Sequence, residues 1–191
     1  MLMHLIQRFR HNQAGVAAAE FAMVLPLLVG IAFGIFEMTT RVQIVDEFER
    51  YAYQFGDYLS RSNELTEADV TEIFDVAGTI MTSVDFAEAS LGVTVASIGY
   101  DEDGTPVILW STTRGGGGPQ INLDKTIGLA EPGQSVLYTT MTVTAPTLFD
   151  IFGGTTITKS TRSIFKPRNT RAIAMDGSLV EDGTHVDGYS Q

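Results

Sequence analysis

The longest hydrophobic stretch of the chain lies near its N-terminus, at residues 16–36. Its sequence, VAAAEFAMVLPLLVGIAFGIF, contains one charged residue, Glu20. As a helix with a rise of about 1.5 Å per residue, the stretch reaches about 30 Å, which matches the hydrocarbon thickness of a bilayer. Helices of water-soluble proteins rarely stay apolar on every side over this length. The pattern therefore predicts a transmembrane helix.

After this stretch, hydrophobic residues recur with a helical period. They stand at Met38, Val42, Val45, Phe48, Ala52, Phe55 and Leu59. Steps of three and four residues are typical of a helix with one apolar face. We therefore expect one helix from Val16 to about Leu59, with a transmembrane half at 16–36 and an amphipathic half at 37–60 that packs on a sheet. A juxtamembrane coiled coil of a signalling protein is the alternative.

The next part of the chain, 61–171, predicts an α+β domain. Residues 66–69, with the sequence TEAD, resemble a capping box, and a short helix is expected over 67–82. Segments rich in β-branched and aromatic residues follow and predict an antiparallel sheet of about four strands. These segments are 92–100, 106–113, 135–145 and 155–165. Residues 172–191 show little apolar periodicity, so a flexible C-terminal tail is expected there.

The distribution of charge predicts how the apolar stretch is oriented. Arg8 and Arg10 precede it without an acidic residue, whereas all but one of the 23 Asp and Glu residues follow it. Because basic segments stay on the cytoplasmic side, we expect a cytoplasmic N-terminus and a periplasmic body. An ordinary signal peptide has small residues after its apolar region. Here Ala14 and Gly15 come before the stretch, so we expect any cleavage on the cytoplasmic side.

The composition argues against most enzyme classes. The 191 residues include no cysteine, and the 3 histidines stand near the ends of the chain, at His4, His11 and His185. Thiol catalysis and cysteine-based metal sites are thereby excluded, and imidazole catalysis inside a core is disfavoured. The net charge of −11 disfavours binding of nucleic acid. We therefore predict a protein that is not an enzyme and needs no cofactor or metal.

Two loops carry weak resemblances to ligand-binding motifs. The turn at 101–105 is acidic but lacks the ligand spacing of a calcium-binding loop, so a solvated turn is expected. Residues 115–118 are four consecutive glycines without the lysine that completes a phosphate-binding loop, so a mobile surface loop is expected.

Residues 15–21, with the sequence GVAAAEF, resemble the processing site of type IV prepilins. In that family a dedicated membrane peptidase cuts after the glycine, and glutamate is the fifth residue of the mature chain. The resemblance implies cleavage after Gly15, with Val16 as the new N-terminus and Glu20 at the fifth position. Over residues 8–41 the chain is most similar to the TadE/TadG-like minor pseudopilins of the tight-adherence (Tad or Flp) pilus system.

This resemblance implies a structural subunit of a pilus that serves surface adherence. A prepilin peptidase would remove the leader, 1–15, and the mature chain would assemble through its N-terminal helix with other pilins and the Tad secretion apparatus. The expected location is the inner membrane, and the cell exterior once the pilus is assembled. Two other functions remain: a membrane-anchored periplasmic binding or sensory module, and an anchored enzyme that relies on carboxylates such as Asp75, Asp85 or Glu88.

Glu20 is the residue on which assembly is expected to depend. A carboxylate within hydrocarbon is costly and normally has a partner, but the stretch contains no Lys, Arg or His. Cleavage would create an α-ammonium group at Val16. A neighbouring helix displaced by about 6 Å along its axis would bring that group beside Glu20. The adjoining Phe21 belongs to the same expected contact.

Further residues of the helix and of the domain are candidates for contacts between subunits. Gly30 and Gly34 match the GxxxG pattern of closely packed membrane helices, and Pro26 predicts a kink or a loosened turn. A basic patch near the C-terminus suits an acidic surface of a neighbouring subunit, although a charged edge strand that prevents aggregation is the alternative. The patch comprises Lys159, Arg162, Lys166, Arg168 and Arg171.

Overall fold

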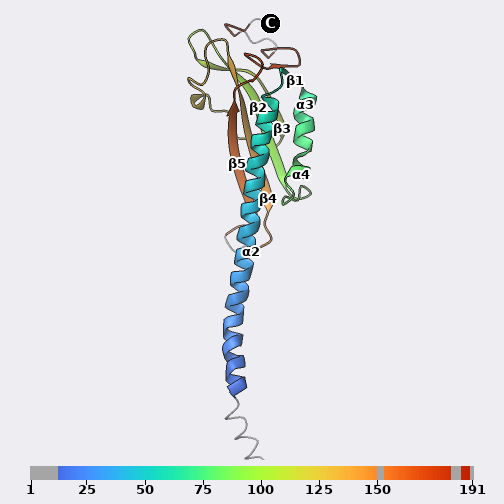
Figure 1. Ribbon diagram of the computed structural model, residues 1–191, viewed down its shortest axis with the longest axis vertical. Helices are drawn as coiled ribbons and strands as arrows, with labels where there is room; N and C mark the ends of the chain where they lie inside the picture. Colours follow the sequence, from blue (N-terminus) through green and yellow to red (C-terminus); the bar gives the residue numbers. More distant parts are fainter. Residues whose placement is uncertain (1–12, 150–152, 182–185, 190–191) are drawn as a thin grey trace, which may run out of the picture.

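The computed structural model describes residues 13–149, 153–181 and 186–189, and it joins one long helix to an α+β domain. Helix α2, Gln13–Leu59, extends well beyond the domain at its N-terminal end, whereas its C-terminal half lies along the sheet (Figure 1). The predicted fold class is confirmed. The helix has 47 residues and continues through Pro26 without interruption.

The sheet contains four antiparallel strands, in the order β3-β2-β4-β5. Their bounds are Ser90–Tyr100 for β2, Pro106–Gly115 for β3, Ser135–Pro146 for β4 and Thr156–Phe165 for β5. All four predicted strands are confirmed, with ends that differ by a few residues. The start of β2 pairs with the end of β4 (Ser90↔Thr144), and this end of the sheet faces the free half of α2 (Figure 1).

Helix α2 packs on β4 and β5 through a face that agrees with the predicted one from Phe48 to Leu59 and differs from it toward the N-terminus. The buried residues of this face are Ile44, Phe48, Tyr51, Ala52, Phe55 and Leu59. Met38 and Val42, which the period assigned to the sheet, are 53% and 45% exposed. The reason is that Glu37 and Arg41, rather than apolar residues, continue the sheet-facing side toward the N-terminus, so the hydrophobic pattern alone gave the wrong register there.

Two short helices and a small parallel sheet complete the domain. Helix α3, Glu67–Asp75, begins with the predicted capping box, in which Asp69 N–H donates to Thr66 Oγ1 and Thr66 N–H donates to Asp69 Oδ2. The single helix predicted over 67–82 is bent, because α3 ends at Asp75 and α4, Ala77–Ile80, follows after Val76. Strand β1, Glu64–Leu65, pairs in parallel with β6, Ala174–Met175.

The described part of residues 172–191 is packed, which corrects the expectation of a flexible tail. Ile173 and Val180 are 0% and 2% exposed and belong to the main core. The indole N–H of Trp110 donates to the carbonyl of Ile173 over 2.8 Å. Apolar periodicity failed here because this segment is neither a regular helix nor a long strand. Its hydrophobic residues contact the core individually, without a regular spacing along the chain.

The glycine-rich loop lies at the surface, as expected, but its second half packs on the sheet. It crosses the face of the sheet that points away from α2. A Cβ atom on Gly118 would lie 2.2 Å from the carbonyl oxygen of Thr140, and one on Gly92 would lie 2.1 Å from that of Gly117. The amide of Gly118 donates to Thr94 Oγ1 over 3.0 Å. Glycine is therefore required at Gly92 and Gly118 by the close approach of two backbones.

Candidate functional site

The N-terminal half of α2 is an uncovered apolar surface. Among the described residues, only the helix Gly15–Leu59 is long and apolar enough to cross a membrane, and its most apolar window has a mean hydropathy of 2.2 with none of its residues buried. Met23 and Leu27 are 75% and 64% exposed. Monomeric water-soluble proteins do not leave an apolar surface of this extent in contact with water. This half of α2 is therefore compatible with a single-pass membrane anchor.

Glu20 lies on this uncovered surface. Its carboxylate is exposed and makes no hydrogen bond or ion pair with any residue that the structure describes. Val16, which lies one helical turn earlier, is 60% exposed, and Phe21 is 59% exposed. The described part of the subunit thus offers Glu20 no counter-ion, and the expected pairing with an α-ammonium group of another subunit stays a prediction.

The candidate glycines also lie in the uncovered half. A Cβ atom on Gly15 or on Gly30 would meet nothing within 4 Å. Gly34 is half-buried, and it follows Phe33, whose ring contacts the domain. Gly30 therefore has no packing role inside the described subunit, which leaves it open to contact with another helix.

The boundary between the two halves of α2 is held by an ion pair that the sequence patterns did not reveal. Arg41 Nε lies 2.8 Å from Oε1 of Glu37, whose side chain is fully buried. Glu37 Oε2 accepts a hydrogen bond from the amide of Phe149 over 3.1 Å. Arg41 Nη2 donates to the carbonyl of Gly154 over 2.9 Å. We call this contact between α2 and the β4–β5 connection the helix–loop junction.

The helix–loop junction also contains an aromatic contact. The ring centroids of Phe33 and Phe149 lie 4.9 Å apart at an interplanar angle of 56°. The spacing of Glu37 and Arg41, one helical turn apart, would have indicated the ion pair. No sequence signal indicated that the loop after β4 covers it, because that contact joins residues more than a hundred positions apart.

The five basic residues near the C-terminus do not form one patch. Lys159 points to α2, where its Nζ lies 3.2 Å from Glu49 Oε1, and Arg168 is paired with Asp57 of the same helix. Arg162 lines a pocket on the opposite face of the sheet. Lys166 and Arg171 are exposed beyond the end of β5. Two of the five cations thus hold α2 on the sheet, and the role in partner docking stays a prediction.

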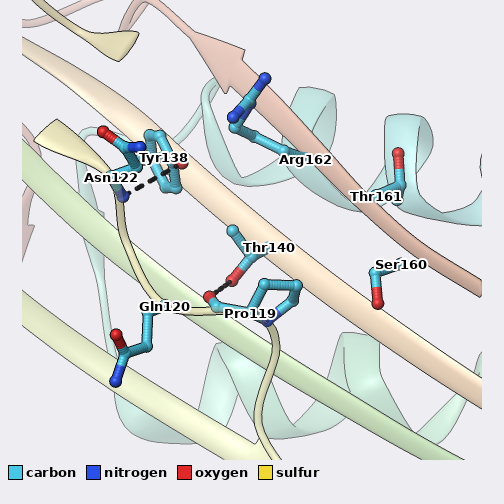
Figure 2. A pocket seen from close by; sticks show the side chains of 8 residues that line it. All are labelled: Pro119, Gln120, Asn122, Tyr138, Thr140, Ser160, Thr161 and Arg162. Atoms are coloured by element: carbon cyan, nitrogen blue, oxygen red, sulfur yellow. Dashed lines mark hydrogen bonds between the residues drawn. The ribbon is translucent and has the colours of Figure 1, made fainter. Parts of the chain in front are cut away.

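A shallow pocket of about 560 Å³ lies on the face of the sheet remote from α2 (Figure 2). Its lining residues are Pro119, Gln120, Asn122, Tyr138, Thr140, Ser160, Thr161 and Arg162. Thr140 Oγ1 donates to the carbonyl of Pro119 over 2.8 Å, and the backbone N–H of Asn122 donates to the hydroxyl of Tyr138 over 3.4 Å. Arg162 is the one charged residue of this lining, so the pocket offers hydrogen-bonding groups without a carboxylate or imidazole for proton transfer.

No group of three or more His, Asp or Glu side chains that could hold a metal ion occurs among the described residues. Comparison of the chain with family models, with curated proteins and with solved structures gave no match. Three features of the described chain bear on function: the uncovered half of α2, the carboxylate of Glu20 and the helix–loop junction.

Proposed function

We propose that the chain is a minor pilin-like structural subunit of a Tad-type pilus. In this proposal residues 16–36 anchor it in the inner membrane, a prepilin peptidase cleaves after Gly15, and the mature helix assembles with other pilins at the base of the pilus or within it. The observation that carries the proposal is the uncovered apolar half of α2 with the unpartnered carboxylate of Glu20.

The single helix supports this proposal because it serves two environments. Its N-terminal half exposes large apolar side chains on all sides, whereas its C-terminal half buries one face against β4 and β5. A subunit that moves from a membrane into a fibre needs a hydrophobic segment that contacts lipid first and other helices later. The same apolar surface serves both states, because lipid tails and packed apolar side chains exclude water equally well.

Glu20 supports assembly rather than simple anchoring. A carboxylate contributes nothing to anchoring and makes insertion less favourable. Its cost is offset once an α-ammonium group of another subunit lies beside it, because the attraction between opposite charges is strong where water is excluded. The pair would therefore select one axial displacement between neighbouring helices.

The outer surface of α2 just beyond the apolar stretch extends the contact surface offered to neighbours. Ile35 is 64% exposed, and together with Met38, Thr39, Val42 and Gln43 it lines a shallow, mainly apolar groove. Met38 and Val42 were expected to face the sheet, but both are exposed. The groove gives a neighbouring helix an apolar surface that starts in the last turn of the apolar stretch and continues beyond it.

Processing is tested by expressing the full chain together with a prepilin peptidase and measuring the mass of the mature N-terminal peptide. We expect a chain that begins at Val16. Gly15→Val should block cleavage, whereas Gly30→Val, the matched control within the helix, should not. A mature chain that begins elsewhere would contradict the proposal.

The role of Glu20 is tested by incorporation into pili. Glu20→Gln removes the charge at nearly constant volume, so we expect normal insertion into the membrane and loss of the subunit from sheared pilus fractions. Glu20→Asp keeps the charge and is expected to restore part of the incorporation. Normal incorporation of Glu20→Gln would show that no charge pair is needed.

The polar pocket on the sheet favours a second candidate, a membrane-anchored periplasmic binding module. Its hydroxyl and amide groups and Arg162 suit a polar or anionic small molecule. This candidate requires neither cleavage after Gly15 nor the charge of Glu20. A chain that functions in cells with both the uncleavable Gly15→Val and the Glu20→Gln substitution would favour it over the pilus subunit.

A further inference from the structure

We propose that the start of the β4–β5 connection, Leu148 and Phe149, rests in the lipid interface of the membrane and seats the domain there before assembly. This inference depends on the proposed membrane anchoring of α2. It concerns a second, separate contact with lipid, made by a segment more than a hundred residues away from the anchor in sequence.

The first argument is depth. Phe149 contacts Phe33, with ring centroids 4.9 Å apart. Phe33 lies inside the apolar stretch, three residues before its end at Phe36, which corresponds to about 4.5 Å along the helix axis. When the apolar stretch lies in the membrane, the ring of Phe149 therefore lies at the level of its last turn, where acyl chains meet the headgroups.

The second argument is that the helix–loop junction fixes this depth. Glu37 accepts from the amide of Phe149 over 3.1 Å, and Arg41 donates to the carbonyl of Gly154 over 2.9 Å. Both flanks of the connection are thus attached to α2 by charged groups. Figure 1 shows the described ends of the connection beside α2, at the end of the sheet nearest to the uncovered half of the helix.

The third argument is chemistry. Leu148 is 64% exposed and Phe149 is 36% exposed, although both are large and apolar. The hydrophobic effect opposes this exposure in water, whereas aromatic and aliphatic side chains are favoured at the lipid interface. Lipid is the occupant that this position selects, because the contacting residue on α2, Phe33, belongs to the stretch that lipid surrounds.

For the unassembled subunit, this contact would restrict the orientation of the domain relative to the membrane. A single helix alone would let the domain tilt in any direction away from the membrane normal. A second contact at Leu148 and Phe149, on one side of α2, limits this tilt and keeps the end of β4 next to the bilayer, while the groove at Met38 and Val42 stays exposed.

The experiment uses the full chain, which lacks cysteine, so single-cysteine variants can be labelled at one position. Leu148→Cys, Leu28→Cys and Ile127→Cys each receive an NBD fluorophore. Leu28 lies in the apolar stretch and is 49% exposed; Ile127 is 63% exposed and precedes β4, at the opposite end of the sheet. The proteins are reconstituted at high lipid-to-protein ratio in vesicles of phosphatidylcholine and phosphatidylglycerol. Emission is compared with and without spin-labelled phosphatidylcholine, and with and without iodide.

We expect spin-labelled lipid to quench the labels at Leu148 and Leu28, with the label at Ile127 quenched by iodide alone. Quenching at Leu28 without quenching at Leu148 would overturn this inference and leave the anchoring intact. No lipid quenching at Leu28 would refute the anchoring and this inference together. A label at Leu148 that is protected from iodide but not quenched by lipid would indicate a neighbouring chain as the occupant, which also overturns the inference.

Discussion

Arg41 and Glu37 form an ion pair of 2.8 Å at the level where α2 leaves its apolar stretch and meets the sheet. Glu37 is fully buried beneath the β4–β5 connection, and Arg41 reaches over it to the carbonyl of Gly154. The ion pair therefore attaches the loop to the helix as well as stabilising the helix itself.

Arg41→Ala is expected to loosen the β4–β5 connection. The substitution leaves the buried carboxylate of Glu37 without its cation and removes the bond to Gly154, and an unpaired buried charge is strongly unfavourable. The amide of Thr147, which donates to the carbonyl of Thr155, reports on the connection. We expect its hydrogen exchange to accelerate by about tenfold, the effect of losing one charged hydrogen bond.

The control for this substitution is Arg50→Ala, which removes an exposed arginine from the same helix. It should leave the exchange of Thr147 unchanged. Equal exchange rates in the parent protein and in Arg41→Ala would show that the connection does not depend on the pair.

Gly118→Ala is expected to destabilise the domain. Its Cβ would lie 2.2 Å from the carbonyl oxygen of Thr140, so the glycine-rich loop would have to move off the sheet. Overpacking of this kind typically costs about 1–3 kcal/mol in the free energy of unfolding. Gly116→Ala, where an added Cβ meets nothing within 4 Å, is the matched control. Urea unfolding of the full chain in detergent should separate the two variants, and equal midpoints would contradict the close packing.

The capping box at the start of α3 should make stability depend on pH. The hydroxyl and the amide of Thr66 donate to Asp69 and hold the pKa of that carboxyl below its ordinary value of 3.8. A carboxyl whose pKa is lower in the folded state stabilises the fold above that ordinary value, and this contribution is lost as the pH falls through the folded pKa.

The corresponding experiment compares the parent protein with Asp69→Asn by urea unfolding at pH 7 and at pH 3. We expect Asp69→Asn to unfold at lower urea at pH 7, and the difference to be smaller at pH 3, which lies below the ordinary pKa of 3.8, so that part of the contribution is lost. Glu72→Gln, an exposed acid on the same helix, serves as the control and should show no such convergence. A difference that stays constant with pH would assign the effect to something other than the charge of Asp69.

Tyr189→Phe tests whether the C-terminal segment stabilises the domain. The Tyr189 hydroxyl accepts from the amide of Tyr100 over 3.0 Å and donates to the carbonyl of Gln134. Loss of both bonds is expected to lower the free energy of unfolding by about 1–2 kcal/mol, the net contribution of two buried hydrogen bonds. The amide of Tyr100 and the carbonyl of Gln134 keep the bond between them, so neither group is left unsatisfied. Tyr53→Phe, at a residue that is 62% exposed, should have little effect. A variant at Tyr189 as stable as the parent would mean that its hydroxyl does not stabilise the domain.

Gly30→Leu tests whether helices approach closely at this glycine. The isolated subunit has open space there, so the substitution should not disturb the domain. In a membrane, the larger side chain is expected to keep a neighbouring helix away and to reduce energy transfer between labelled subunits severalfold. Ala32→Leu, at an exposed position nearby, is the control. Unchanged transfer in Gly30→Leu would exclude a contact through this glycine.

Much of the fold could be predicted from sequence because its signals are local. The capping box Thr66–Asp69, the end of the long helix at Leu59 and the four strands each follow from neighbouring residues whose propensities and spacing agree. Local signals of this kind determine where an element begins and ends. The fold class can therefore be predicted from them without knowledge of any long-range contact.

What could not be predicted depends on contacts between distant residues. The apolar period assigned Met38 to the sheet, yet the charged Glu37 is buried there because Phe149 donates to it from another element. The packing of Ile173 under Trp110 and the close approach of Gly118 to Thr140 likewise depend on segments far apart in sequence. The sequence shows Glu20 as the single charged residue of the apolar stretch, but in our proposal its partner belongs to another subunit.

The pairing of β1 with β6 has a consequence for biosynthesis. Glu64 is hydrogen-bonded into a ladder with Ala174, and close by the side chain of Asn169 donates to the carbonyl of Arg61, 108 residues earlier. The segment that follows the long helix is therefore fixed only after residues 169–175 have been synthesised. While a ribosome is still translating the strands, the domain stays open, so any chaperone that protects it must act at least until β6 has emerged.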